Sequence, residues 1–183
     1  MATPASKRSR KAPAATPPPA KVASADVAAG AELRRLIQAF IRSFGLLTAD
    51  ETPCGQPLAT SHAHALMFLL DSAREGTRPT QQALGHALGI DKSNVARLAR
   101  RMESAGHLAQ GRSKEDGRAR LLSLTARGTR LAEQVEQASG ERYASVISAV
   151  PLVVRSTLFE SLAALNRAVT VTRPETTLSE KQS

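Results

Sequence analysis

The sequence predicts a mainly α-helical protein that carries one small β-hairpin. Apolar residues recur at intervals of three or four through most of residues 31–171, which is the helical period. Residues 107–125 break this pattern, because two short segments at 107–112 and 119–125 flank a charged tip with an Asp-Gly turn signal. Two short helices joined by a tight turn precede the hairpin. The layout is therefore a winged helix-turn-helix with further helices at both ends.

Composition narrows the classes of function. The 183 residues suffice for one domain with a tail or two small domains, and the formal net charge of +9 favours a polyanionic partner. Aromatic residues make up 3% of the chain and Trp is missing, which argues against base stacking on single strands. A single cysteine excludes an intrachain disulfide and a Cys-rich zinc module. The longest apolar run, residues 65–70, is too short for a membrane span, and no secretory signal is visible. We expect a cytoplasmic protein without a membrane partner.

The chain divides into five predicted segments. Residues 1–30 are mostly Ala, Pro, Ser, Thr and basic residues, which predicts a disordered basic arm. The arm either adds attraction to phosphates or is a dispensable extension. A helix and a loop follow at 31–60, then the winged helix-turn-helix lobe at 61–125, further helices at 126–171 and a frayed tail at 172–183.

The helix-turn-helix carries clear local signals. Gly89 is suited to end the first helix in a left-handed conformation, and Asp91 is suited to cap the second. Ile90 and Val95 occupy the positions of a hydrophobic staple. The predicted inner faces are Leu84, Ala87 and Leu88 in the first helix, and Val95, Leu98, Ala99, Met102 and Ala105 in the second. Gly106 is expected to end the second helix.

The outer face of the second helix is polar and cationic. Arg can pair with guanine and Asn with adenine in the major groove, while other cations hold phosphates. The candidate recognition-helix residues are Lys92, Ser93, Asn94, Arg97, Arg100 and Arg101, and the candidate wing residues are Arg112, Lys114, Asp116, Arg118 and Arg120. Charged helix faces are often only solvated, but a capped cationic helix beside a cationic hairpin favours binding to double-stranded DNA.

These residues resemble the MarR family of bacterial winged-helix transcription regulators. The resemblance covers residues 61–128 and extends weakly to the flanking helices. It is carried by the segment LGIDKSNVARLARRMESAG at 88–106, by Asp116 and Arg118 of the wing, and by LTARG at 124–128. It implies a homodimer, more often a repressor than an activator, that binds a pseudo-palindromic operator and is found in the bacterial cytoplasm, associated with the nucleoid. Arg118 would then enter the minor groove, oriented by Asp116.

The resemblance also assigns the terminal helices to a dimerisation domain. Thr125 is suited to cap a long helix, and Pro151 is expected to break it before a final helix. The predicted apolar stripes contain Leu33, Leu36, Ile37, Phe40, Phe44 and Leu47 near the N-terminus, Leu131, Val135, Val146, Ile147 and Val150 in the long helix, and Leu158, Leu162, Leu165 and Val169 in the last one. None of these helices has an obvious intrachain partner that would bury its stripe.

Members of this family often bind a small aromatic or phenolic effector in a cleft between the dimer helices and the DNA-reading lobe. Arg34, His62 and His64 are the candidates for such a cleft, although a histidine on a buried helix is more often a core residue. Cys54 lies in a loop and is open to three interpretations: a redox sensor, a metal ligand with His62 or His64, or an inert thiol, which we favour. We expect no metal site and no cofactor.

Other classes of function remain as alternatives. The chain offers no nucleophile–base pair and no phosphate-binding loop after a strand, so we do not expect an enzyme. An architectural or nucleoid-type protein with little sequence preference is the main competitor, given the charge and the basic arm. A dimeric adaptor whose wing no longer contacts DNA is a third, disfavoured by the Arg and Asp residues of the recognition helix and wing.

Overall fold

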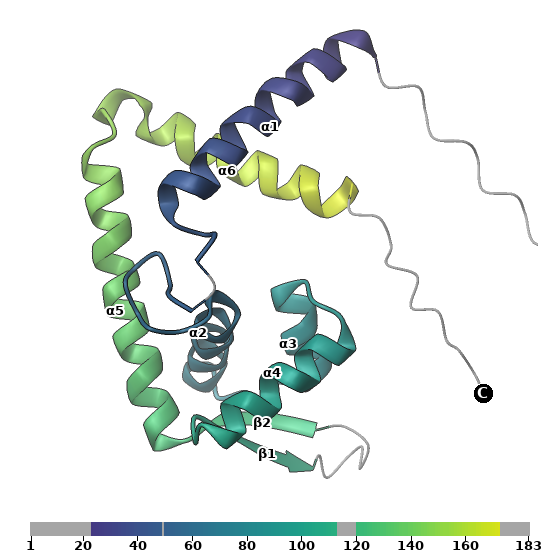
Figure 1. The fold of residues 1–183 in the computed structure, drawn as a ribbon, viewed down its shortest axis with the longest axis vertical. Helices are drawn as coiled ribbons and strands as arrows, with labels where there is room; N and C mark the ends of the chain where they lie inside the picture. The colour runs from purple at the N-terminus through teal and green to yellow at the C-terminus, as the bar shows by residue number, and fades with distance from the viewer. Residues whose placement is uncertain (1–22, 49, 113–119, 173–183) are drawn as a thin grey trace, which may run out of the picture. The chain divides into compact units, whose positions relative to one another are not determined.

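The structure is a computed structural model that describes residues 23–48, 50–112 and 120–172 (Figure 1). These residues form helices and one two-stranded antiparallel sheet, as the sequence predicted: a mainly α fold with a hairpin wing. The elements are α1 (Ser24–Phe44), α2 (Thr60–Arg74), α3 (Gln81–Leu88), α4 (Lys92–Ser104), β1 (Leu108–Arg112), β2 (Arg120–Leu124), α5 (Ala126–Ser148) and α6 (Leu152–Thr172). The chain divides into two compact units, residues 1–42 and 43–183.

The helix α1 begins at Ser24, so residues 24–30 are helical and do not belong to a disordered arm as the sequence predicted. The segment from Ser24 to Ala31 is rich in alanine, the strongest helix former, and carries Asp26 in the first turn where the helix dipole favours an acid. Sequence reasoning missed this start because it relied on apolar periodicity, which a run of alanines lacks. Residues 1–22 of the predicted arm and 173–183 of the predicted tail lie outside the described residues.

The hydrophobic core lies in the second unit, where α2 runs between α5 and the pair α3–α4 (Figure 1). Leu66 of α2, Leu84 of α3, Met102 of α4 and Leu122 of β2 are almost completely buried. Burying one such side chain contributes about 1.5–3 kcal/mol of transfer free energy. Ala132 and Val135 add the first half of α5 to this cluster. The winged helix-turn-helix lobe is therefore a packed body that includes the start of α5.

Gly85 allows α3 and α4 to approach closely. A Cβ on Gly85 would lie 2.8 Å from a methyl group of Val95, so the α3–α4 crossing needs a residue without a side chain there. The buried residues of α3 are Leu84 and Gly85, whereas Ala87, which the sequence assigned to the inner face, is exposed. The assignment of Ala87 was wrong because α4 packs against the glycine side of α3.

The wing pairs β1 with β2 in the register Leu108↔Leu124, Gln110↔Leu122 and Arg112↔Arg120. Thr80, just before α3, forms an isolated bridge with Leu121, and the amide of Leu122 donates to the carbonyl of Pro79 at 2.8 Å. The hairpin is thereby held to the start of the helix-turn-helix by backbone hydrogen bonds. The tip, residues 113–119, lies outside the described residues.

The long helix α5 starts as the sequence predicted. The Thr125 hydroxyl accepts from the amide of Gly128 at 3.0 Å and donates to the carbonyl of Gly106 at 2.6 Å. Arg74 of α2 donates to both carboxylate oxygens of Glu136 at 2.6 and 2.7 Å, which adds a polar contact between α2 and α5. The second half of α5 leaves the core, and Val146 is exposed. Pro151 separates α5 from α6, in which no residue is buried.

We predict that Gly128→Ala destabilises the lobe strongly. A Cβ at this position would lie 1.9 Å from the carbonyl oxygen of His107, so the strand and the helix would have to separate, at a cost of about 1–3 kcal/mol or more. Gly140→Ala in the same helix is the matched control: it meets nothing within 4 Å and should stabilise α5 by up to about 1 kcal/mol. Urea unfolding of both variants makes the comparison, and equal stability would contradict the close contact.

Candidate nucleic-acid interface

The helix α4 begins with a complete N-terminal cap. One carboxylate oxygen of Asp91, Oδ1, accepts from the amides of Ser93 and Asn94 at 2.9 Å each, and from the Ser93 hydroxyl at 2.7 Å. These bonds satisfy donors that the first turn of a helix leaves without partners. The hydrogen bonds from Asn94 and Ser93 lower the pKa of Asp91 to about 2. Asp91 therefore carries its negative charge throughout the physiological range.

The two faces of α4 differ sharply. Val95, Leu98, Ala99 and Met102 are buried, and Ala105 just beyond the helix is half-buried. The recognition-helix candidates are all exposed: Lys92, Ser93, Asn94, Arg97, Arg100 and Arg101. The helix thus presents a continuous surface of donors and cations, supported from behind by the core. This is the arrangement that reading base edges from a major groove requires.

Several exposed side chains of α4 are hydrogen-bonded to one another. The Asn94 amide nitrogen donates to Oδ2 of Asp91, and the Asn94 amide oxygen accepts from Nη2 of Arg97 at 2.5 Å. Arg100 donates from Nε to the carbonyl of Ala96 at 3.3 Å. The sequence predicted these residues as independent DNA contacts and did not predict the bonds among them.

The described part of the wing adds two more cations. Arg112 and Arg120 are exposed and directly opposite each other in the hairpin register. Like charges in cross-strand pairs destabilise a hairpin, and an anion between them would relieve the repulsion. The other wing candidates, Lys114, Asp116 and Arg118, lie outside the described residues and stay predictions.

A chain of side-chain hydrogen bonds joins the wing to the helix-turn-helix. Gln81 at the start of α3 donates to the amide oxygen of Gln110 in β1 at 2.5 Å, and Gln110 donates to a carboxylate oxygen of Glu103 in α4 at 2.8 Å. Sequence reasoning missed these residues, because their meeting depends on the packing of α3, α4 and β1 together. They connect β1 of the wing to α3 and α4.

The three candidate effector residues have different surroundings in the structure. His62 of α2 makes a hydrogen bond to His107, between Nε2 and Nδ1 at 3.2 Å. Burial lowers the pKa of His62 to about 4, with smaller contributions from the positive charges of His107 and Arg101. Burial, together with Arg127, also lowers the pKa of His107. His64 is exposed on α2, and Arg34 belongs to the other unit. His62 is thus engaged within the lobe, and the effector cleft stays a prediction.

Cys54 is half-buried in the loop between α1 and α2, and its sulfur lies 3.0 Å from the Thr52 hydroxyl. Among the residues that the structure describes, no three or more His, Cys, Asp or Glu side chains gather where they could hold a metal ion. None of the described helices carries an apolar stretch of the length that a lipid bilayer would require. The redox interpretation of Cys54 stays untested.

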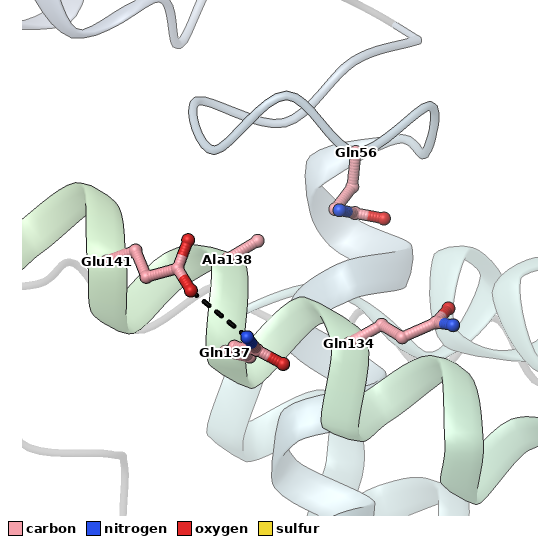
Figure 2. Close-up of a pocket in the computed structure, with 5 residues that line it drawn as sticks. All are labelled: Gln56, Gln134, Gln137, Ala138 and Glu141. Atoms are coloured by element: carbon pink, nitrogen blue, oxygen red, sulfur yellow. Dashed lines mark hydrogen bonds between the residues drawn. The ribbon is translucent and has the colours of Figure 1, made fainter.

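An open hollow of about 440 Å³ lies between the loop before α2 and the middle of α5 (Figure 2). Its lining residues are Gln56, Gln134, Gln137, Ala138 and Glu141, and Gln137 donates to Glu141 at 3.1 Å. An aromatic ring needs apolar walls, which amide and carboxylate groups do not provide. This hollow is therefore a poor site for the aromatic effector that the sequence resemblance implies.

We predict that the burial of His62 makes the lobe sensitive to acid. The pKa of His62 falls from 6.5 in the unfolded chain to about 4 in the fold, so the unfolded state binds more protons between these values. Stability is therefore fully present above about pH 6.5 and is lost as the pH falls toward about 4. His62→Gln should reduce the loss of urea midpoint between about pH 7 and about pH 5, and His64→Gln, at an exposed position of the same helix, is the matched control. The same pH dependence in both variants would contradict this role.

Comparison with known proteins agrees with this geometry. Residues 57–119 match the profile of the MarR family. No curated protein matches the chain. The solved structures with similar folds include the PcaV transcriptional regulator from Streptomyces coelicolor in complex with its natural ligand, with a TM-score of 0.56 and 24% identity over 76% of this chain and 92% of that one.

Two further structures have similar folds. The MepR–DNA complex of S. aureus has a TM-score of 0.60 and 20% identity, over 75% of this chain and 96% of that one. BpsR of Bordetella bronchiseptica, whose DNA binding is regulated by 6-hydroxynicotinic acid, has a TM-score of 0.57 and 21% identity, over 75% and 91%. At these identities the likeness establishes the winged-helix fold. The profile match over residues 57–119 and the similar folds agree with the resemblance to the MarR family seen in the sequence.

Proposed function

We propose that this chain is a sequence-specific transcription regulator that binds double-stranded DNA as a homodimer, with α4 in the major groove and the wing over the adjacent minor groove. The observation that carries the proposal is the outer face of α4. Its exposed donors and cations are supported by a buried inner face, next to the exposed cations Arg112 and Arg120 of the wing. MepR, which has a similar fold, was solved in complex with DNA.

The proposed homodimer is supported by apolar surface on the terminal helices. Soluble monomers rarely expose large contiguous apolar patches. In α6 the exposed large apolar residues are Leu152, Val153, Val154, Phe159, Leu162, Val169 and Val171, and in α1 they are Val27, Leu33, Leu36, Ile37 and Phe40. A second copy of the chain would remove these residues from water. Two copies of α4 would then read two half-sites of an inverted repeat, about one helical turn apart.

The second part of the proposal is that a small molecule regulates DNA binding. PcaV was solved with its natural ligand, and 6-hydroxynicotinic acid regulates DNA binding by BpsR. For this chain we propose repression that a small aromatic or phenolic effector relieves. The polar hollow of Figure 2 does not suit such a ligand, so we look for the site among the apolar side chains that dimerisation would cover.

The first test is a selection from randomised duplexes by the full-length chain at physiological salt, followed by sequencing of the retained DNA. We expect enrichment of an inverted repeat, because each recognition helix reads one half-site. Tight binding without enrichment of any sequence, with a steep salt dependence, would favour the architectural alternative that the net charge of +9 also permits.

Substitution of single arginines tests the two reading elements separately. On the enriched duplex, Arg100→Ala in α4 and Arg118→Ala in the wing should each lower affinity by about 1–3 kcal/mol without unfolding the protein. Arg130→Ala, which removes the same charge from an exposed position on α5, is the control and should have little effect. A folded Arg118→Ala variant with unchanged affinity would refute the proposed role of the wing.

A further inference from the structure

The carboxylate of Asp91 does more than cap a helix. Capping requires an acceptor for the amides of the first turn, and Oδ1 already takes both of those bonds. The second oxygen, Oδ2, accepts from the side-chain amide of Asn94. Asp91 therefore fixes the Asn94 side chain as well as the helix end.

Asn94 in turn makes a hydrogen bond to Arg97. Its amide oxygen accepts from Nη2 of Arg97 at 2.5 Å, so the amide group lies between a carboxylate and a guanidinium. The residues are spaced by three positions, which places their side chains on the same side of the helix. The orientation of the amide follows from its partners, because only its nitrogen can donate to the carboxylate and only its oxygen can accept from the guanidinium.

We propose that Asp91 is a positioning residue that determines DNA sequence specificity, because it holds Arg97 through Asn94 in one orientation on the outer face of α4. This inference rests on the proposed function and assigns Asn94 a different task from the one that the sequence predicted: Asn94 links Asp91 to Arg97 and is not an independent reader of adenine. Arg97 then meets a base with its guanidinium already ordered. A bidentate contact with guanine depends on that orientation.

The charge of Asp91 has a separate effect, on the affinity for any duplex. Its side chain is exposed at the N-terminus of α4 and ionised at neutral pH. A carboxylate at this place repels phosphates and so weakens binding to every duplex alike. This repulsion lowers both affinities and leaves their ratio unchanged, so the proposed gain in discrimination comes from the ordered Arg97.

Arg100 provides the comparison within the same helix. Its Nε donates to the carbonyl of Ala96, an atom of the helix backbone, and among the described residues Arg100 makes no hydrogen bond to Asp91 or Asn94. A change at Asp91 should therefore alter the contribution of Arg97 and leave that of Arg100 unchanged.

The decisive experiment is a pair of double-mutant cycles with Asp91→Ser in the full-length chain. Serine caps helices about as well as aspartate but offers no second oxygen for Asn94. Affinities are measured for the enriched duplex and for a scrambled duplex of equal length, at one salt concentration. We expect Asp91→Ser to lower the ratio of the two affinities about tenfold, the scale of one well-made base contact. The Asp91→Ser and Arg97→Ala effects should be non-additive, whereas Asp91→Ser and Arg100→Ala should add.

Each outcome has one interpretation. An unchanged ratio in Asp91→Ser, or additivity with Arg97→Ala, would overturn the positioning role while leaving the proposed function intact. A ratio near one for the unaltered protein would overturn the proposed function itself. A second measurement needs no DNA: the Nε–H resonance of Arg97 should show an ordered guanidinium in the free protein and a mobile one in Asp91→Ser and Asn94→Ala. Equal mobility in all three proteins would contradict the proposal.

Discussion

The junction between the hairpin and α5 is the constraint on which the rest of the lobe depends. The Thr125 amide donates to the carbonyl of His107 at 3.1 Å, its hydroxyl donates to the carbonyl of Gly106, and Gly128 brings the first turn of α5 against the His107 backbone. The amide of His107 donates in turn to the carbonyl of Met102, at the end of the recognition helix. One short segment thereby joins the end of α4, the start of β1 and the start of α5.

This junction gives a physical meaning to the Leu-Thr-x-x-Gly pattern at 124–128. Leu124 packs against the core, Thr125 caps α5, and Gly128 permits the close approach of helix and strand. Because α5 is also one of the helices proposed to dimerise, its fixed attachment to the lobe would carry the geometry of the dimer to α4. A signal that moves α5 would then move the recognition helix with it, which is what an effector-controlled regulator needs.

Features set by local chemistry could be predicted from the sequence. The caps at Asp91 and Thr125, the left-handed Gly89 and the two strands of the hairpin depend on residues close together in the chain, and the structure agrees with each. Features that depend on packing between elements could not be predicted from the sequence. The exposure of Ala87, the tight contact at Gly85 and the pairing of His62 with His107 follow from how α2, α3 and α4 meet.

The candidate site also combines features that could be predicted from the sequence with features that could not. The polar outer face of α4 could be predicted from the helical period, but the chain from Asp91 through Asn94 to Arg97 depends on side-chain orientations that periodicity does not specify. The chain of hydrogen bonds from Gln81 through Gln110 to Glu103 could not be predicted without the register of β1 and the packing of α3. The roles of Asp116 and Arg118 still rest on the sequence resemblance.

The most direct measurement is a hydroxyl-radical footprint of the full-length protein on the enriched duplex, combined with the number of chains bound per duplex. Two recognition helices in successive major grooves predict two chains per duplex and protected backbone segments related by two-fold symmetry, with centres about one helical turn apart. A single protected segment with one chain bound, or uniform protection that grows with protein concentration, would contradict a dimer that reads DNA through paired α4 helices.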